Sequence, residues 1–319
     1  MHDAPHQIAA EIKQHAARIG FDLCGIAPAS PSIYRDYLLN WLDTGQAGEM
    51  HFLRERVAER LDPALYLPGV KSVICVALNY HTPLAPVPEG HGKIARYAQG
   101  DDYHKRLKQM LYDLGDWVRA TYPGAQTRSA TDSAPIMERE LAARAGVGWV
   151  GKNTCVISPQ IGSWILLGEV MTTLELPPDT PAIDRCGTCT RCIDACPTAA
   201  ITQPYQLDAT RCISYLTIEH TGDITDELKS KTGDWLFGCD ICQDVCPFNG
   251  RAPDTALAWL QPRIASNSVD PQKVLDFSLD DYHHFTRRSA IRRVKLPVLQ
   301  RNARTVIDNR GQQSQGAPG

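Results

Sequence analysis

Cysteine is the residue type whose number and spacing point most strongly to chemistry in this chain of 319 residues. Eight of the 11 cysteines lie between Cys186 and Cys246. The first four have the spacing C-x2-C-x2-C-x3-C-P, and its last part, C-x2-C-x3-C-P, is repeated up to Pro247. Such a run brings three thiolates to one iron–sulfur cube and sends the fourth to a neighbouring cube. The sequence therefore predicts two [4Fe–4S] clusters.

The crossing rule of two-cluster ferredoxins assigns each cysteine to one of these clusters. The first expected ligand set is Cys186, Cys189, Cys192 and Cys246. The second expected set is Cys196, Cys212, Cys239 and Cys242, in which Cys212 supplies the ligand that the second motif lacks. Zinc is the alternative, because it also binds four cysteines at C-x2-C spacing. The run of three cysteines ending in Cys-Pro favours iron–sulfur clusters.

Low-potential clusters carry single electrons and usually serve another redox centre. No G-x-G-x-x-G follows a predicted strand, so a dinucleotide fingerprint is absent. The residues Asp102, His104 and Leu107 are similar to an Asp-x-His-x-x-Gly motif that supplies a cobalamin ligand in some enzymes. Leu107 replaces the glycine, which favours a solvated helix start instead. The three scattered cysteines are expected to be packing residues: Cys24, Cys75 and Cys155.

Composition and charge set the class of protein. A 43% hydrophobic content is sufficient for two or three packed units. No run approaches the roughly 18 to 20 apolar residues of a membrane span, and no secretory or twin-arginine signal is recognisable, so we expect a cytoplasmic protein. The 33 Lys and Arg nearly balance the 36 Asp and Glu, which excludes a uniformly basic nucleic-acid binder. The stretch from Arg287 to Arg310 nevertheless holds eight basic residues and one acid.

The elements that must position these residues follow from hydrophobic periodicity and from Gly and Pro signals. Apolar residues at helical spacing predict helices over residues 8–19, 34–42, 103–122 and 135–146. Short β-branched runs predict strands over residues 21–27 and 72–78. Residues 154–158 and 164–173 flank a turn, PQIGS, and predict a hairpin. Alternating helices and strands indicate a layered α/β domain.

The segment LPPDTP at residues 176–181 is the clearest linker. The chain is therefore expected to contain an α/β domain at 1–178, a ferredoxin-like double-cluster domain at 179–250 and a helical, basic region at 251–310. A Gln- and Gly-rich tail at 311–319 is expected to be disordered.

Short stretches along nearly the whole chain form an ordered set around the cysteine motifs. They are residues 59–63 (ERLDP), 67–69 (LPG), 96–98 (RYA), 102–104 (DYH), 132–135 (DSAP), 148–153 (GWVGKN), 211–217 (RCISYLT), 237–240 (FGCD) and 289–293 (SAIRR). With the double cysteine motif, this set resembles the epoxyqueuosine reductases, which perform the last step in making the queuosine base of transfer RNA.

The resemblance implies a cobalamin-dependent enzyme, with the corrin held base-off in the α/β domain beside one cluster. Members reduce the epoxide on the cyclopentane ring of the modified base to the alkene, with two electrons and two protons. The resemblance further implies a tRNA anticodon loop as substrate and an electron donor of the flavodoxin or ferredoxin type. We expect a monomer that does not bind membranes. Longer members continue into helical repeats.

Site residues also follow from the resemblance. Asp132 would be the proton donor, because epoxide opening develops an alkoxide that a neutral acid must protonate. That role requires a pKa raised by a buried, apolar site. The alternative is that Asp132 only precedes the helix starting at Pro135. Arg139 would contact the substrate, or instead form a surface ion pair. The expected cofactor contacts are Arg60, Asp132, Lys152, Asn153, Val156 and Leu167.

Some of these contacts have simpler explanations. Val156 and Leu167 would otherwise be ordinary core residues, and Lys152 and Asn153 would form a turn. The basic stretch would neutralise tRNA phosphates, or be an ordinary arginine-rich surface. Its residues are Arg287, Arg288, Arg292, Arg293, Lys295, Arg301 and Arg304.

Two other functions compete with this interpretation. A corrinoid reductive dehalogenase shares cobalamin and two clusters, but normally carries a twin-arginine export signal, which is not recognisable here. A ferredoxin-type electron carrier needs only a small docking domain, and the expected α/β unit is larger than that.

Overall fold

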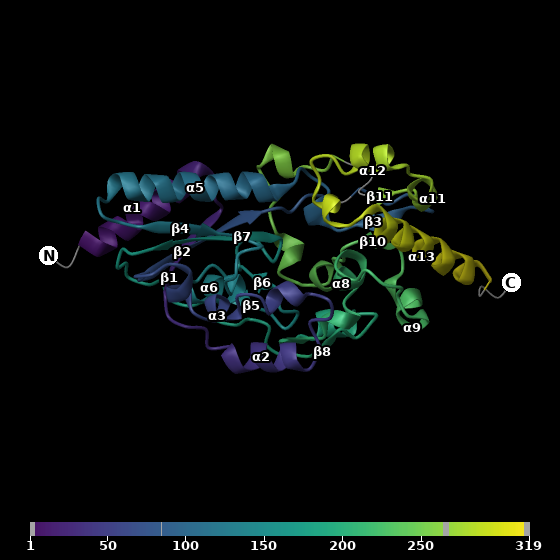
Figure 1. Ribbon diagram of the computed structural model, residues 1–319, viewed down its shortest axis with the longest axis horizontal. Helices are drawn as coiled ribbons and strands as arrows, with labels where there is room; N and C mark the ends of the chain where they lie inside the picture. The colour runs from purple at the N-terminus through teal and green to yellow at the C-terminus, as the bar shows by residue number, and fades with distance from the viewer. Residues whose placement is uncertain (1–3, 84, 264–267, 316–319) are drawn as a thin grey trace.

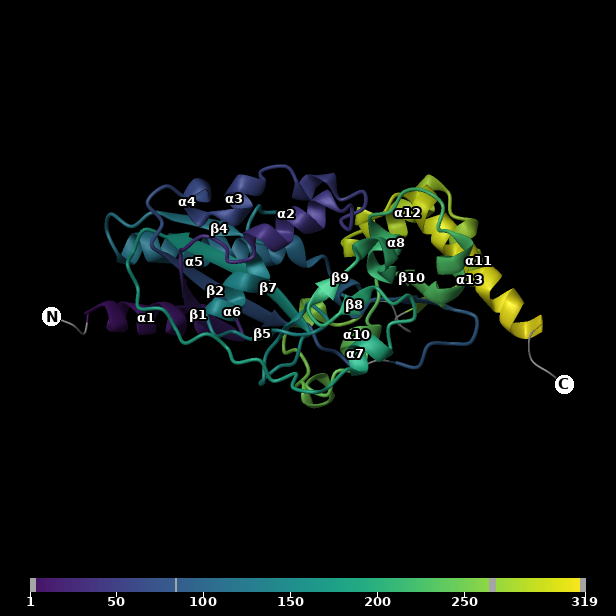
Figure 2. The same ribbon diagram turned by 90° about the horizontal axis from the view of Figure 1, so that it is seen from below.

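The computed structural model describes residues 4–83, 85–263 and 268–315. A helix-covered sheet occupies one part of the molecule, and the cysteine segment and the last helices occupy the other (Figure 1). Helix α1 (Ala4–Ile19) and the end of helix α13 (Leu296–Gln315) lie at opposite ends in both views (Figures 1 and 2). None of the helices in the described ranges is both long and apolar enough to cross a membrane.

The main sheet has four strands in the order β1-β2-β7-β4, and every neighbouring pair is antiparallel. The strands are β1 (Leu23–Pro28), β2 (Ser72–Asn79), β7 (Ile165–Thr172) and β4 (Thr127–Ala130). Strand β2 is buried at every residue, because it lies inside the sheet and helices cover both faces. Its apolar, β-branched sequence fits that position.

Helices cover both faces of this sheet. Helix α1 and helix α5 (Tyr103–Thr121) pack on one face, where α5 presents a fully buried stripe that includes Leu107 and Leu111. Helix α6 (Glu138–Arg144) packs on the other face. At Gly25 of β1, a Cβ atom would lie 2.0 Å from the carbonyl oxygen of Ala145, so only glycine allows α6 this close. Helices α2 (Arg35–Asp43), α3 (Val57–Leu61) and α4 (Pro63–Tyr66) complete this side of the lobe.

Most of the predicted elements of this lobe are confirmed within a few residues: the helices over 8–19, 34–42 and 103–122, the strands over 21–27 and 72–78, and the α/β layering. The hairpin prediction was wrong. Strand β6 (Val156–Ile157) pairs with β5 (Trp149–Val150), and the isolated bridge of Ser158 with Gly162 connects the first segment to the PQIGS turn rather than to the second segment. The reason is that β7 is a largely buried inner strand of the main sheet. It pairs with β2 on one side and with β4 on the other, so it has no free edge for a hairpin partner.

The helix predicted from Pro135 begins three residues later, at Glu138. Residues 135–137 instead continue the turn after β4, where the Ile136 carbonyl accepts a hydrogen bond from Arg60 Nη1 at 3.2 Å. This correction matters for the site, because the non-helical turn carries Asp132.

The second lobe is built from short elements. Those of the cysteine segment are α7 (Arg191–Asp194), β8 (Ile201–Gln203), β9 (Gln206–Leu207), α8 (Ile213–Ile218), α9 (Asp226–Lys229), β10 (Trp235–Phe237) and α10 (Ile241–Asp244). After them come β11 (Ser268–Val269), α11 (Pro271–Leu275), α12 (Leu279–Phe285) and α13. Helix α13 continues to Gln315, so residues 311–315 are helical rather than disordered, and residues 316–319 lie outside the described part.

A three-stranded sheet links the predicted domains. Strand β3 (Gly92–Ile94) lies between β10, to which it is parallel, and β11, to which it is antiparallel. Residues from the predicted domains at 1–178, 179–250 and 251–310 therefore share one sheet, and the last of these regions is not purely helical.

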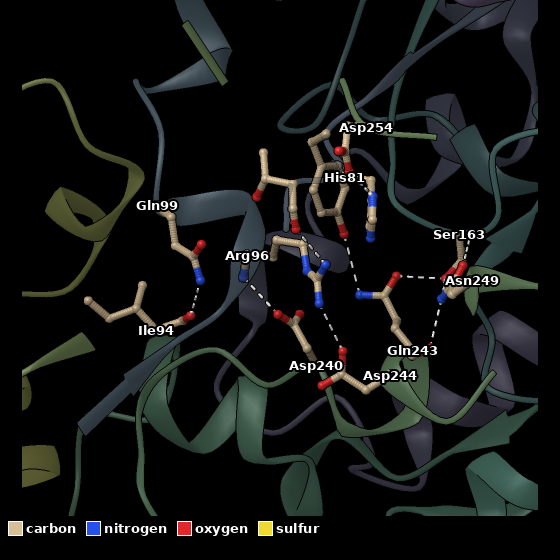
Figure 3. Close-up of polar contacts among 12 residues, drawn as sticks. His81, Ile94, Arg96, Gln99, Ser163, Asp240, Gln243, Asp244, Asn249 and Asp254 are labelled. Atoms are coloured by element: carbon tan, nitrogen blue, oxygen red, sulfur yellow. Dashed lines mark hydrogen bonds and ion pairs between the residues drawn. The ribbon is translucent and has the colours of Figure 1, made fainter. Parts of the chain in front are cut away.

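A buried polar network also fastens the cysteine segment to the first lobe (Figure 3). The guanidinium of Arg96 donates to Asp244 at 3.1 Å and to the Thr82 carbonyl at 2.8 Å. It lies 4.1 Å from the ring centroid of Trp164. The backbone N–H of Arg96 donates to Asp240, the residue after Cys239. One arginine thus orients the second cysteine motif.

Candidate functional site

The first cysteine group surrounds a cavity of about 230 Å³ at the amino end of α7, where Arg191 and Cys192 line it. Two contacts from outside the motif hold its loop. Lys152 Nζ donates to the carbonyls of Gly187 at 2.6 Å and Cys189 at 3.0 Å, and Trp149 Nε1 lies 3.4 Å from Cys186 Sγ. The cysteines that line this cavity are Cys186, Cys189, Cys192 and Cys246.

The second cysteine group surrounds a larger cavity of about 370 Å³. Burial raises the pKa of the Cys239 and Cys212 thiols, so a thiolate here needs a cation to stabilise it. A ninth cysteine, Cys155, also lines this cavity, as do Tyr97 and Arg139. Its other cysteines are Cys196, Cys212, Cys239 and Cys242.

The two groups have the same membership as the two sets expected from spacing. Helices α7 and α10, which carry Cys192 and Cys242, lie side by side (Figure 2). Asn153 lines both cavities and therefore lies between them. Within the described ranges, no three His, Cys, Asp or Glu side chains converge closely enough to hold a single metal ion. Each set of four thiols instead surrounds a space, which suits the bulk of a four-iron cube.

Asp132 lies in the turn after β4 and has a left-handed backbone, with φ 51°. Its Oδ2 atom lies 2.7 Å from His104 Nε2. The other ring nitrogen, Nδ1, lies 2.6 Å from Asp102 Oδ1. Asp102 caps α5 by accepting the His104 backbone N–H, which explains why the histidine lies at this point in the helix. The result is a chain of three side chains, Asp102, His104 and Asp132.

Two carboxylates keep His104 charged. The hydrogen bond to Asp102, and next that to Asp132, raise the pKa of the imidazole to about 9, against the effect of its partial burial. At neutral pH the ring is therefore an imidazolium that donates from both nitrogens. The site can hold and move a proton at Asp132 Oδ2.

Two sequence expectations need correction here. The side chain of Asp132 is 46% exposed and lies against His104. Asp132 therefore does not lie in the buried, apolar surrounding that was expected for a proton donor. The 102–104 segment is a capped helix start, as expected, but its histidine is not merely solvated. Both segments belong to the stretches that carried the family resemblance, which was a signal that could have linked them.

A second acidic group lies behind Asp132 and was not anticipated. The carboxylate of Glu138 accepts the backbone N–H of Asp132, and burial raises the pKa of Glu138 to about 7. Glu169 of β7 is fully buried, and neither of its carboxylate oxygens has a partner among the described residues. Burial, and next the charge of Glu138, raise the pKa of Glu169 far above its usual range. A glutamate within the apolar run ILLGEVMT was the available sequence signal.

The predicted cofactor residues are distributed unevenly. The buried Nε of Arg60 has no partner among the described residues, although its Nη1 is bound. Asn153 lies between the cavities, whereas Lys152 is engaged by the first cysteine loop. Val156 is a buried core residue and Leu167 is partly buried against the same core, and neither lines a described cavity.

Arg139 lies where a substrate residue would be useful. It lines the second cavity, and its Nη1 donates to the Thr154 carbonyl at 3.0 Å. Among the described residues, Arg139 does not form the surface ion pair that was the alternative expectation.

The basic stretch is partly committed to the protein. Arg288 pairs with Asp101, and Arg293 pairs with Glu219. Arg301 is partly buried and donates to the carbonyls of His220, Gly222 and Leu216, so it is a packing residue rather than a phosphate contact. The remaining predicted phosphate contacts are exposed: Arg287, Arg292, Lys295 and Arg304.

Comparison with known families identifies two regions. A family model described as epoxyqueuosine reductase QueG, DUF1730, matches residues 60–133, and a 4Fe–4S double cluster binding domain matches residues 185–249. An epoxyqueuosine reductase of Gloeobacter violaceus is 41% identical over 310 residues, which cover 95% of this chain and 97% of that protein.

Solved structures agree with this match. One is an epoxyqueuosine reductase with an epoxyqueuosine-modified tyrosine tRNA stem loop, with a TM-score of 0.89, 32% identity, and coverage of 96% of this chain and 82% of that chain. Another is the Bacillus subtilis enzyme with an aspartate-bearing catalytic loop swung out of the active site. Its TM-score is 0.89 at 31% identity, with coverage of 97% of this chain and 83% of that chain.

Proposed function

The chain belongs to the epoxyqueuosine reductase family, and we infer from this that it reduces epoxyqueuosine in tRNA to queuosine. The reaction consumes two electrons and two protons and releases the epoxide oxygen as water. The observation that carries the inference at the site is the link between the hydrogen-bonded chain Asp102, His104 and Asp132 and the second cysteine cavity. The His104 ring stacks on Tyr103 at 4.1 Å between centroids, and the Tyr103 ring lies 6.3 Å from that of Tyr97, which lines this cavity.

The electrons are proposed to pass through two [4Fe–4S] clusters bound by the eight cysteines. The first set, around the cavity with Cys186, would accept electrons from a flavodoxin- or ferredoxin-type donor. The second set shares its cavity with Arg139 and with Tyr97, whose ring lies 6.3 Å from that of Tyr103, the residue before His104. Asn153 lines both cavities and therefore lies between the two proposed clusters.

Cobalamin is the proposed partner of the second cluster, and this part of the chain suits such a group. The unpaired, buried Nε of Arg60 offers a hydrogen-bond donor, and the second cavity extends beyond its cysteines to Arg139. Arg60, Asn153 and Asp132 are the residues that would hold the cobalamin. When bound, cobalamin would supply a low-potential cobalt centre as the immediate reductant. Lys152 and Val156 are less suited to contact it, because both are engaged within the protein.

Proton delivery is the task of this chain's own side chains. The hydrogen bond between His104 Nε2 and Asp132 Oδ2 holds one proton, and its transfer to Asp132 makes that carboxyl a neutral acid. Asp132 then protonates the oxygen that leaves the carbon, and a second proton delivered by the same route releases water. Asp102 keeps the imidazole oriented and favours its charged form.

Replacement of Asp132 tests this assignment. Asparagine tolerates the left-handed backbone better than alanine does, so Asp132→Asn removes the acid with little added strain. We expect single-turnover reduction of epoxyqueuosine tRNA to fall by about 10²- to 10⁴-fold, and Asp132→Ala to fall at least as far. Iron and corrin content should stay at wild-type levels.

Asp113→Ala is the matched control, because Asp113 is an exposed acid on α5 away from the site. It should retain full activity. Wild-type turnover by Asp132→Asn would overturn the proton-donor role.

A further inference from the structure

An exposed aromatic ring lies beside an arginine that is bound to Glu219, a lining residue of the second cavity. Phe52 belongs to the short 3-10 helix His51–Leu53, and its exposed fraction is 43%. The guanidinium carbon of Arg293, in the 3-10 helix Ala290–Arg293, lies 5.7 Å from the centroid of the Phe52 ring. Two segments far apart in the sequence thus bring an aromatic face and a cation together at the surface.

The arginine is held firmly but not covered. Its Nε and Nη2 donate to the two carboxylate oxygens of Glu219 at 3.1 and 2.8 Å. The side chain is nevertheless 56% exposed. A carboxylate that binds the edge of a guanidinium leaves the planar faces of that group free for stacking. Arg293 is therefore a fixed, flat and charged surface.

The pair lies close to the proposed chemistry. Glu219 and Met50, two residues before Phe52, both line the second cavity, together with Tyr97 and the cysteines. The hydrogen bond to Glu219 raises the pKa of Arg293, and the negative charge of Asp132 raises it further. Arg293 thus lies within electrostatic reach of the proposed proton donor.

We propose that Phe52 and Arg293 form a stacking platform for an unpaired RNA base next to the modified base that enters the site. This inference rests on the proposed function. Single-stranded RNA is recognised chiefly by stacking of splayed bases on aromatic rings and on arginine planes. A platform for the neighbouring base would hold the loop while the modified base lies in the cavity. The charge of Arg293 would also attract the phosphate of the stacked nucleotide.

Tyr112 provides a closely matched control within the same chain. Its exposed fraction is 44%, and Lys108 Nζ lies 5.7 Å from its ring centroid, nearly the geometry of the Phe52 pair. Tyr112 lies on α5 more than two turns beyond His104 and lines neither cysteine cavity. A general effect of removing an exposed, cation-paired aromatic ring would affect both positions equally.

The test measures the affinity of cofactor-loaded protein for a fluorescent, unmodified anticodon stem loop at several salt concentrations. We expect Phe52→Ala to weaken binding by about 5- to 150-fold, the range for loss of one stacked base. Phe52→Trp should bind at least as well as wild type, and Tyr112→Ala should be unchanged. Arg293→Gln should lower the slope of log affinity against log salt by about 0.7 to 0.9, whereas Phe52→Ala should leave that slope intact.

Several results would overturn the platform. They are unchanged affinity of Phe52→Ala, an equal loss in Tyr112→Ala, or a loss of iron or corrin from Phe52→Ala that accounts for the weaker binding. Failure of the proposed function has a different signature, because wild-type protein would then bind the stem loop but leave the epoxide intact. A wild-type protein that reduces the epoxide while Phe52→Ala binds normally would reject the platform alone.

Discussion

At the scale of single residues, the position of Asp132 depends on neighbours from three different elements. Its backbone is held by Glu138 at the start of α6, and its carboxylate is held by His104 in the first turn of α5. Arg60 approaches the same turn from α3 through the Ile136 carbonyl. The proposed proton donor is thus positioned through both its main chain and its side chain.

The pKa of His104 predicts how the rate depends on pH. The groups that face this imidazole are Asp102, Asp132 and the stacked ring of Tyr103, at 4.1 Å between centroids. Because the two carboxylates raise the pKa from 6.5 to about 9, the imidazolium is present below that pH and is lost as the pH rises through it. We therefore expect the single-turnover rate of pre-reduced enzyme to fall between about pH 8 and pH 10.

His104→Gln should reduce the substrate slowly. Its rate should also lack this fall at alkaline pH, the alkaline limb of the profile, since glutamine does not titrate. His283→Gln, at an exposed histidine of α12, should keep the wild-type profile. An alkaline limb that persists unchanged in His104→Gln would assign the titration to another group.

The sequence anticipated how the cysteines group around the two cavities better than it anticipated the contacts of the acidic residues. Cysteine spacing is local and almost independent of tertiary structure, so both sets of four could be assigned before the fold was known. The contact between His104 and Asp132 joins residues 28 positions apart, and Glu169 reaches the same region from a central strand. No periodicity encodes such contacts, because they depend on which helix packs on which strand.

At the scale of elements, predictions that depend on the apolar pattern of a single segment were confirmed. The prediction of which two strands pair with each other was wrong. The stripe of α5 that includes Leu107 and Leu111 is an example of success. The segment at 164–173 was correctly identified as a strand, but its neighbours β2 and β4 are remote in sequence. The nearby turn PQIGS suggested that this strand pairs with the segment just before the turn. The strand instead lies buried inside the sheet, where both of its edges are already paired.

The Arg96 network predicts how the second cysteine motif depends on the first lobe. Arg96 is buried, and its removal would leave Asp244 and the Thr82 carbonyl without their donor. We expect Arg96→Leu to cost about 3 kcal/mol, seen as a fall in Tm of several degrees and as loss of iron from the purified protein.

Arg119→Leu removes an exposed arginine whose ion pair with Asp116 lies on the surface of α5. Such pairs contribute about 0 to 1 kcal/mol, so this variant should be close to wild type in both measurements. Equal effects of the two substitutions would show that Arg96 has no special role in fastening the lobes.

At the scale of the whole molecule, the chain is interlocked rather than modular. Strand β3, from the predicted domain at 1–178, forms one sheet with β10 and β11 of the later regions. Helix α13 packs on β10. The linker at residues 176–181 therefore marks a change of composition in the sequence but not a break in the structure. This arrangement keeps both cysteine groups at fixed positions relative to Asp132.

Iron counting tests the crossed assignment of cysteines in the assembled protein. Anaerobically purified wild type should hold about eight irons per chain. Cys186→Ala and Cys246→Ala, although 60 positions apart, should abolish the same paramagnetic signal, and Cys196→Ala and Cys239→Ala should abolish the other. Loss of different signals from Cys186→Ala and Cys246→Ala would contradict the crossing, and stoichiometric zinc in place of iron would contradict the clusters themselves.

The central claim, that this protein removes the epoxide oxygen from epoxyqueuosine in tRNA, is tested most directly by mass analysis of the nucleosides after reaction. Reduced, cobalamin-loaded protein would be incubated without oxygen with epoxyqueuosine tRNA, and the tRNA would then be digested. The account predicts that the modified nucleoside loses one oxygen atom and becomes queuosine, and that Asp132→Asn leaves it unchanged under the same conditions. Epoxyqueuosine that persists with protein shown to contain reduced clusters and corrin would contradict the account.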